Sequence, residues 1–110
     1  MFVQHCSGEF EIGVGGEDHC GPDHNSPKRL TYDVRIEYPD SALDEHGFLL
    51  DNLVFRRYFD SLRYTEDSCE LLAKRCADHL HEMTGHRASK ISVDISVPGL
   101  ADIEYDMEVA

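Results

Sequence analysis

GFLLDNLVFRRYFDSLRYTEDSCELLAKRCADHLHEMTG, residues 47–85, predicts two consecutive helices, and the rest of the chain is organised around them. The first helix is predicted to start at Asp51. Its apolar side chains recur at the three- and four-residue spacing of one helical face, at Val54, Phe55, Tyr58, Phe59 and Leu62. The opposite face carries Arg56, Arg57 and Asp60. Such an amphipathic helix needs an apolar surface to cover.

The second helix has signals at both of its ends. Thr65 offers a side-chain oxygen as a cap, while Glu66 and Asp67 place negative charge in a first turn whose backbone amides are unpaired. Gly85 suits the left-handed conformation that ends many helices. Between these ends runs one apolar stripe, formed by Cys69, Leu72, Ala73, Cys76, Leu80 and Met83. Because only two residues separate the predicted helices, we expect a tight antiparallel or elbowed pair.

Four segments outside the helices alternate between apolar and polar residues, the pattern of half-buried strands. They span residues 9–14, 29–39, 90–99 and 102–109. Their order with the helices is ββααββ. This order predicts an α+β fold in a single domain, residues 1–110, with a four-stranded antiparallel sheet and both helices on its apolar face.

The second face of the predicted sheet is polar and acidic. In the last strand it carries Asp102, Glu104, Asp106 and Glu108. Such a face is either solvated on a single molecule or lines the water-filled interior of a barrel that several copies form through their strand edges. We therefore expect a homo-oligomer with a barrel as one of two alternatives.

Composition and charge exclude several classes of partner. The 110 residues include 22 acidic and 10 basic side chains, a formal net charge of -12. This charge repels nucleic-acid backbones and anionic membrane surfaces, so we expect neither as a partner. The chain has no apolar run as long as a membrane span, and MFVQHCSGEF at its start lacks the features of a signal peptide. We expect a cytoplasmic protein.

The helical pattern predicts the state of two of the four cysteines. Cys69 and Cys76 lie two helical turns apart on one stripe, too far apart to form a disulfide with each other. Both are expected to be buried free thiols. The sequence leaves the state of Cys6 and Cys20 open.

Two short motifs resemble those of a known fold. HGFLLDN, residues 46–52, and SCELLA, residues 68–73, look like the tunnelling fold (T-fold), in particular the pyruvoyl-tetrahydropterin synthase and carboxy-tetrahydropterin synthase group. In that group a stretch like Gly47–Asp51 leads into the first helix, and residues like Ser68 and Glu70 open the second. The resemblance covers the chain from about Leu30 onward. It implies a planar pterin-like or purine-like ligand at a subunit boundary, with Ser68 and Glu70 near it.

The resemblance also implies a zinc ion, held by a histidine in the first strand and a His-Gly-His entering the second. His5 stands in the first place, but the His-Gly-His position holds Lys28, Arg29 and Leu30, which cannot ligate zinc. A shifted loop would deliver His24 and Cys20 beside His5 instead. The expected zinc ligands are therefore His5 and His24, with solvent-exposed histidines as the alternative.

Catalysis in the group that the chain resembles depends on a cysteine, and Cys20 stands in approximately that place. A reactive thiolate needs a neighbouring base or cation, and His19, His24 or Lys28 could serve, with His24 as the candidate catalytic residue. Other parts of the group's machinery are missing: no Asp-His motif lies between the helices, and the glutamate expected in the third strand is replaced by Ser96 or Val97.

Three functional interpretations follow. The first is a ligand-binding T-fold protein related to the pterin enzymes, with catalysis in doubt. The second is a non-catalytic homo-oligomeric assembly or interaction protein that has lost the site. The third is an enzyme like the nitrile reductase of queuosine biosynthesis, because CGPDHNSP, residues 20–27, loosely resembles a loop of that relative.

Overall fold

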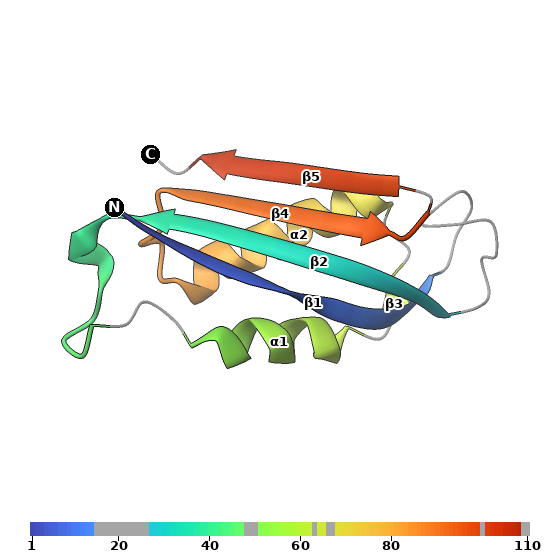
Figure 1. The fold of residues 1–110 in the computed structure, drawn as a ribbon, viewed down its shortest axis with the longest axis horizontal. Helices are drawn as coiled ribbons and strands as arrows, with labels where there is room; N and C mark the ends of the chain where they lie inside the picture. Colours follow the sequence, from blue (N-terminus) through green and yellow to red (C-terminus); the bar gives the residue numbers. More distant parts are fainter. Residues whose placement is uncertain (15–26, 48–50, 63, 66–67, 100, 109–110) are drawn as a thin grey trace.

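The protein folds as one sheet covered on one face by two helices (Figure 1). The computed structural model describes residues 1–14, 27–47, 51–62, 64–65, 68–99 and 101–108. In chain order the elements are β1 (Phe2–Val14), β2 (Pro27–Tyr38), the 3-10 helix η1 (Asp40–Ala42), α1 (Asn52–Ser61), β3 (Tyr64–Thr65), α2 (Cys69–Met83), β4 (Lys90–Val97) and β5 (Ala101–Glu108). The predicted ββααββ order is confirmed.

The four long strands pair antiparallel in the order β1-β2-β4-β5. The first strand is longer than the predicted segment, because its pairing with β2 continues to Phe2, opposite Tyr38. Between 2 and 8 the inward positions include Gln4 and Gly8, so the sequence shows no clean alternation there. Pairing with a strongly alternating neighbour extends the strand where its own pattern is weak.

The two-residue strand β3 was not predicted. It lies between the helices and pairs parallel with residues 13–14 of β1, extending the sheet by a fifth strand. The predicted helix cap at Thr65 is therefore wrong, since Thr65 belongs to β3. The second helix starts later, at Cys69, after a cap at Ser68.

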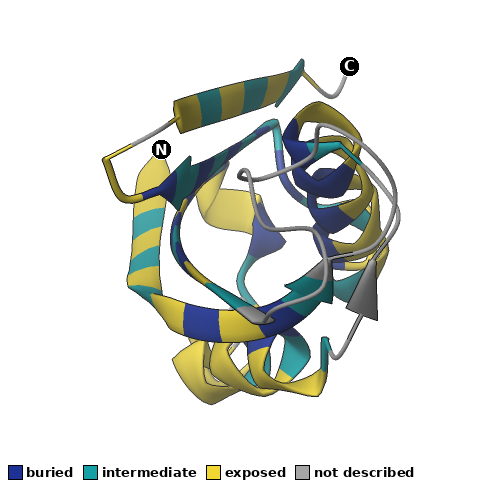
Figure 2. Cartoon of the chain, turned by 90° about the vertical axis from the view of Figure 1, so that its right-hand side faces the viewer, coloured by how far each residue is buried: buried dark blue, intermediate teal, exposed yellow. Residues whose placement is uncertain are grey.

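The apolar face of the sheet and the inner faces of the helices form one core. In Figure 1, α1 lies along β1 and α2 runs behind β4, while Figure 2 shows the buried residues on the sides of the helices that face the sheet. Phe55 and Phe59 of α1 and Leu80 of α2 are fully buried, as the helical spacing predicts. The sheet contributes Phe10, Ile12, Leu30, Tyr32, Val34, Ile36, Ile91, Val93 and Ile95.

The cysteines differ from the prediction at one position. Cys76 is a free, fully buried thiol that accepts a hydrogen bond from the Tyr58 hydroxyl at 3.6 Å, and burial raises its pKa to about 11. Cys69 is disulfide-bonded, so the prediction of a free thiol there is wrong. Helical spacing excludes a bond between Cys69 and Cys76 but says nothing about partners from other elements.

In the described part of the chain, no helix has both the length and the apolar character needed to cross a lipid bilayer.

Candidate functional site

The outer face of the sheet, opposite the helices, collects most of the charged side chains of the strands. Alternation along β4 places Ser92, Asp94 and Ser96 on this face, while Ile91, Val93 and Ile95 enter the core. The antiparallel register then aligns carboxylates across three strands, because Asp94 lies opposite Asp33 of β2 and Glu104 of β5. The predicted acidic face is present.

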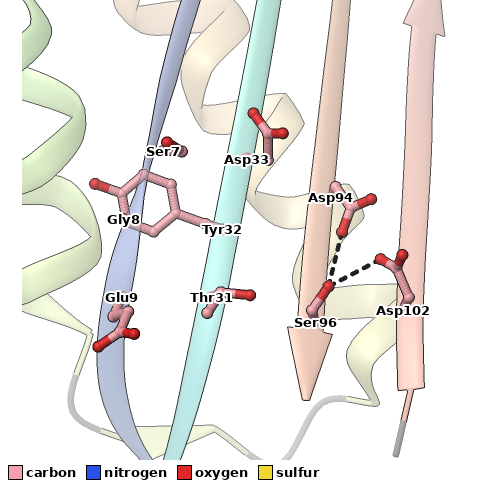
Figure 3. Close-up of a pocket in the computed structure, with 9 residues that line it drawn as sticks. All are labelled: Ser7, Gly8, Glu9, Thr31, Tyr32, Asp33, Asp94, Ser96 and Asp102. Carbon is pink, nitrogen blue, oxygen red and sulfur yellow. Dashed lines mark hydrogen bonds between the residues drawn. The ribbon is translucent and has the colours of Figure 1, made fainter. Parts of the chain in front are cut away.

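A shallow open depression of 490 Å³ lies on this outer face (Figure 3). None of the nine described residues that line it is lysine, arginine or histidine. Besides Gly8 and Tyr32, its lining consists of four carboxylates and three aliphatic hydroxyls, from Glu9, Asp33, Asp94, Asp102, Ser7, Thr31 and Ser96. The depression is therefore electrically negative and rich in hydrogen-bond acceptors.

One hydroxyl connects two of these carboxyl groups. Ser96 Oγ lies 3.1 Å from Asp94 Oδ1 and 2.9 Å from Asp102 Oδ1, as the dashed lines in Figure 3 show. Partial burial raises the pKa of Asp94 to about 6, and its hydrogen bonding with the Asp102 carboxyl adds to the rise. Hydrogen bonds with Asp94 and with Ser96 hold the pKa of Asp102 below its usual value. The two carboxyls therefore hold a proton between them below about pH 6.

A second, smaller depression of 220 Å³ adjoins the first and shares Asp33 and Asp94 with it. Here His5 Nε2 contacts the Asp33 carboxylate. Arg35 and Lys90 bring positive charge to the same depression.

The predicted zinc site involves His5, which lies on the outer face, and His24, which lies outside the described residues. In the described ranges, no three histidine, cysteine, aspartate or glutamate side chains converge to hold a metal ion. The His-Gly-His position offers no ligand either, since Leu30 is fully buried and Arg29 donates to Glu11 at 3.1 Å. A zinc site with His5 and His24 stays a prediction.

The predicted ligand-binding residues lie at the start of α2. Ser68 is the N-cap, and its Oγ accepts a hydrogen bond from the Leu71 amide at 3.2 Å. Glu70 is exposed on the first turn, where the unpaired amides favour a negative charge. Leu71, beside it, leaves 46% of its surface in solvent. The first turn thus presents one carboxylate and one apolar side chain to solvent.

The predicted catalytic residues, Cys20 and His24, both lie outside the described residues. The described site residues therefore fall into two groups on opposite sides of the sheet. His5 belongs to the outer face, while Ser68 and Glu70 belong to the helix layer.

Comparison with known proteins gives a fold and no family. Neither a model of a known protein family nor a curated protein matches the sequence. A solved archaeosine synthase QueF-like, in its apo form, superposes with a TM-score of 0.67 at 15% identity, covering 96% of this chain and 91% of that one. A putative dihydroneopterin aldolase from Vibrio cholerae O1 biovar El Tor has a TM-score of 0.62 at 14% identity, covering 98% of both chains.

Dihydroneopterin aldolase of E. coli, solved in complex with neopterin, superposes over 100% of both chains, with a TM-score of 0.60 at 13% identity. The chain has the tunnelling fold. The predicted architecture is thereby confirmed. The finer resemblance to the pyruvoyl-tetrahydropterin synthase group stays a prediction, because identities this low concern the fold alone.

Sequence reasoning missed the bridge between Asp94, Ser96 and Asp102. The signals for it were present, since both segments alternate and the intervening Pro98–Gly99 predicts a turn. Pairing the strands around that turn sets Ser96 opposite Asp102. The proximity of the carboxyls depends on this register, which no single strand shows.

Proposed function

We propose that this T-fold protein binds a planar heterocycle of the pterin or purine type at the boundary between two copies of the chain. The observation that carries the proposal is the exposed Glu70 carboxylate on the first turn of α2, in a fold shared with an aldolase solved with neopterin. A carboxylate can accept two parallel N–H bonds from the amino group and ring nitrogen of such a heterocycle. Leu71 offers apolar surface beside it.

The proposed partner is a second copy, because both long edges of the described sheet have free stretches. β5 pairs with β4 on one side, and in the described residues no strand covers its other side. β1 is covered by β3 only at residues 13–14. Such edges suit pairing with further copies into a barrel, with the acidic face inside.

The same proposal keeps Cys20 and His24 as the candidate catalytic residues and His5 with His24 as the candidate zinc ligands. The second candidate function is a homo-oligomeric assembly without a ligand. The strongly acidic outer face and the open strand edges favour it, because both suit a barrel with or without a bound heterocycle.

The experiment is a binding assay with a panel of pterins and purines, by calorimetry and by thermal shift. We expect at least one ligand to bind and to raise the melting temperature. Glu70→Gln should weaken binding by about 10-fold or more, the effect of losing a charge-assisted hydrogen bond. The matched control is Glu82→Gln, an exposed carboxylate at the other end of α2, which should bind as wild type.

Two results would overturn the proposal. The absence of binding across the panel would leave the assembly function, which sedimentation analysis of the ligand-free protein then tests. Equal affinity in the Glu70→Gln variant and the wild type would remove Glu70 from the site.

A further inference from the structure

The edge strand β5 is held less firmly than the rest of the sheet. Among the strands that the structure describes, it pairs only with β4, and none of its described residues is buried, as its colouring in Figure 2 shows. Its inward residues Ile103, Tyr105 and Met107 pack only at the margin of the core. The interactions of β5 with β4 on the outer face therefore weigh heavily in its stability.

The outer face works against this pairing when its carboxylates are charged. Asp94 lies directly opposite Glu104 of β5 and Asp33 of β2, and like charges at such cross-strand positions repel. Positive charge in the adjoining depression, which Asp94 also lines, comes from Arg35 of β2 and Lys90 of β4, beside His5 of β1. Their contacts to Glu37 and Asp106 are 3.8 and 3.9 Å long. The helices pack on the opposite side of β4.

The Ser96 hydroxyl requires a proton on its neighbours to complete its two contacts. A hydroxyl has one hydrogen, so it donates one full hydrogen bond and accepts others through its oxygen. Carboxylates only accept when ionised. Full bonds from Ser96 to both Asp94 and Asp102 therefore need one of the two carboxyls to be protonated and to donate to the serine oxygen.

We propose that Asp94, Ser96 and Asp102 form a proton-dependent latch between β4 and β5, closed when the carboxyl pair holds a proton and open when the proton is lost. Closure completes the bridge from β4 to β5 through Ser96 and removes one negative charge from the carboxylates that face one another across the strands. Opening leaves two carboxylates around one hydroxyl and restores the repulsion. The raised pKa of Asp94, about 6, sets the pH at which the latch opens. Because the depression is open to solvent, the proton exchanges freely with water.

The latch sets how firmly one edge of the sheet is held. Since β5 is the outermost strand on its side, its pairing with β4 decides whether that edge is ordered when a second copy meets it. The device thus couples the pH of the surroundings to the order of one sheet edge.

The test is residue-level amide hydrogen exchange of the full chain at about pH 5 and about pH 7.5, corrected for the intrinsic exchange rate. We expect the opening equilibrium of the β5 amides to be about 5-fold larger at the higher pH, the factor that a strong cross-strand charge pair produces. Asp94→Asn keeps the shape and donates to Ser96 at every pH, so the pH dependence should vanish. Ser96→Ala removes the bridging oxygen, so this variant should show a smaller pH dependence than the wild type.

The matched control is Asp106→Asn, which removes a carboxylate from the same face of β5, opposite Ser92. It should retain the pH dependence of the wild type. Equal β5 protection at both pH values in the wild type would overturn the latch. So would an Asp106→Asn variant that loses the dependence as completely as Asp94→Asn, since the effect would then be one of total charge.

Discussion

At the scale of single residues, Gly8 is the position where β1 passes closest to the aromatic core. It pairs with Tyr32 across the sheet, and the Tyr32 ring stacks on Phe59 with centroids 3.8 Å apart. A Cβ at Gly8 would lie 2.7 Å from the Tyr32 hydroxyl oxygen and 2.9 Å from its ring carbon Cζ. The buried ring cannot retreat, because Phe59 is packed against it. The absence of a side chain at Gly8 is therefore a packing requirement.

Gly8→Ala should destabilise the fold by about 1–3 kcal/mol, the usual cost of overpacking a core. The entropic gain from replacing a glycine, about 0.4–1 kcal/mol, offsets only part of it. Chemical denaturation measures the change. Ser7→Ala, the neighbouring outer-face position, is the control and should stay within about 0.5 kcal/mol of wild type. A Gly8→Ala variant as stable as wild type would show that Tyr32 can move.

At the scale of elements, the start of α2 shows a competition between strand and helix. The residues before it were predicted to cap the helix, but the backbone of Tyr64–Thr65 pairs with the end of β1 instead. Ser68 caps the helix instead, as the next residue in the described chain with a suitable side-chain oxygen. The first helix meets no such competition. It was predicted to start at Asp51, and this residue is its cap, accepting a hydrogen bond from the Leu53 amide at 2.9 Å.

Ser68→Ala should lower the stability of the protein by about 1 kcal/mol, since it leaves a first-turn amide unpaired. Ser68→Asp is the matched variant, because an aspartate can cap and also favours the positive end of the helix. It should keep wild-type stability. Thermal and denaturant unfolding compare the three proteins. If both variants lost the same amount of stability, the capping role would be contradicted, because an aspartate can also cap a helix.

At the scale of the whole molecule, charge and pH act together on stability. The folded pKa of Asp94, about 6, exceeds its ordinary value of 3.8, so the native state binds more protons than the unfolded state between these values. The stability that Asp94 contributes is present below about pH 4 and is lost as the pH rises through 6. The lowered pKa of Asp102 has the opposite effect on stability. Its contribution is present above pH 3.8 and is lost only as the pH falls below that value. With a net charge of -12, repulsion adds to the loss at higher pH.

We therefore expect the melting temperature of the wild type to fall between about pH 5 and about pH 7.5. Raising the salt concentration from about 0.02 M to about 0.5 M should recover part of the loss, because the Debye length shrinks to a few ångströms. The recovery should be larger at the higher pH, where more carboxylates are charged. Calorimetric scans at the four conditions test this. A melting temperature that rises with pH would contradict the assignment of the shifted carboxyl.

The sequence by itself determined most of the residues that form the helices and long strands, and which face of each is buried. Those properties are local, because the spacing of Phe55 and Phe59, or of Ile91, Val93 and Ile95, follows directly from the geometry of one element. It also determined the acidic character of the outer face, since alternation sends one set of side chains to each side. Ser68 and Glu70 were placed at the start of the second helix by the resemblance of the SCELLA motif and not by such local reasoning, which put the cap at Thr65.

Only the tertiary structure decided where strands meet and what their register brings together. The pairing of residues 64–65 with β1, the extension of β1 to Phe2, the contact of His5 with Asp33 and the bridge through Ser96 all depend on neighbours in another strand. A strand shows its own period but not its partner's offset, and an offset of one residue exchanges the two faces. The proton-sharing pair of Asp94 and Asp102 is for this reason a property of the folded sheet.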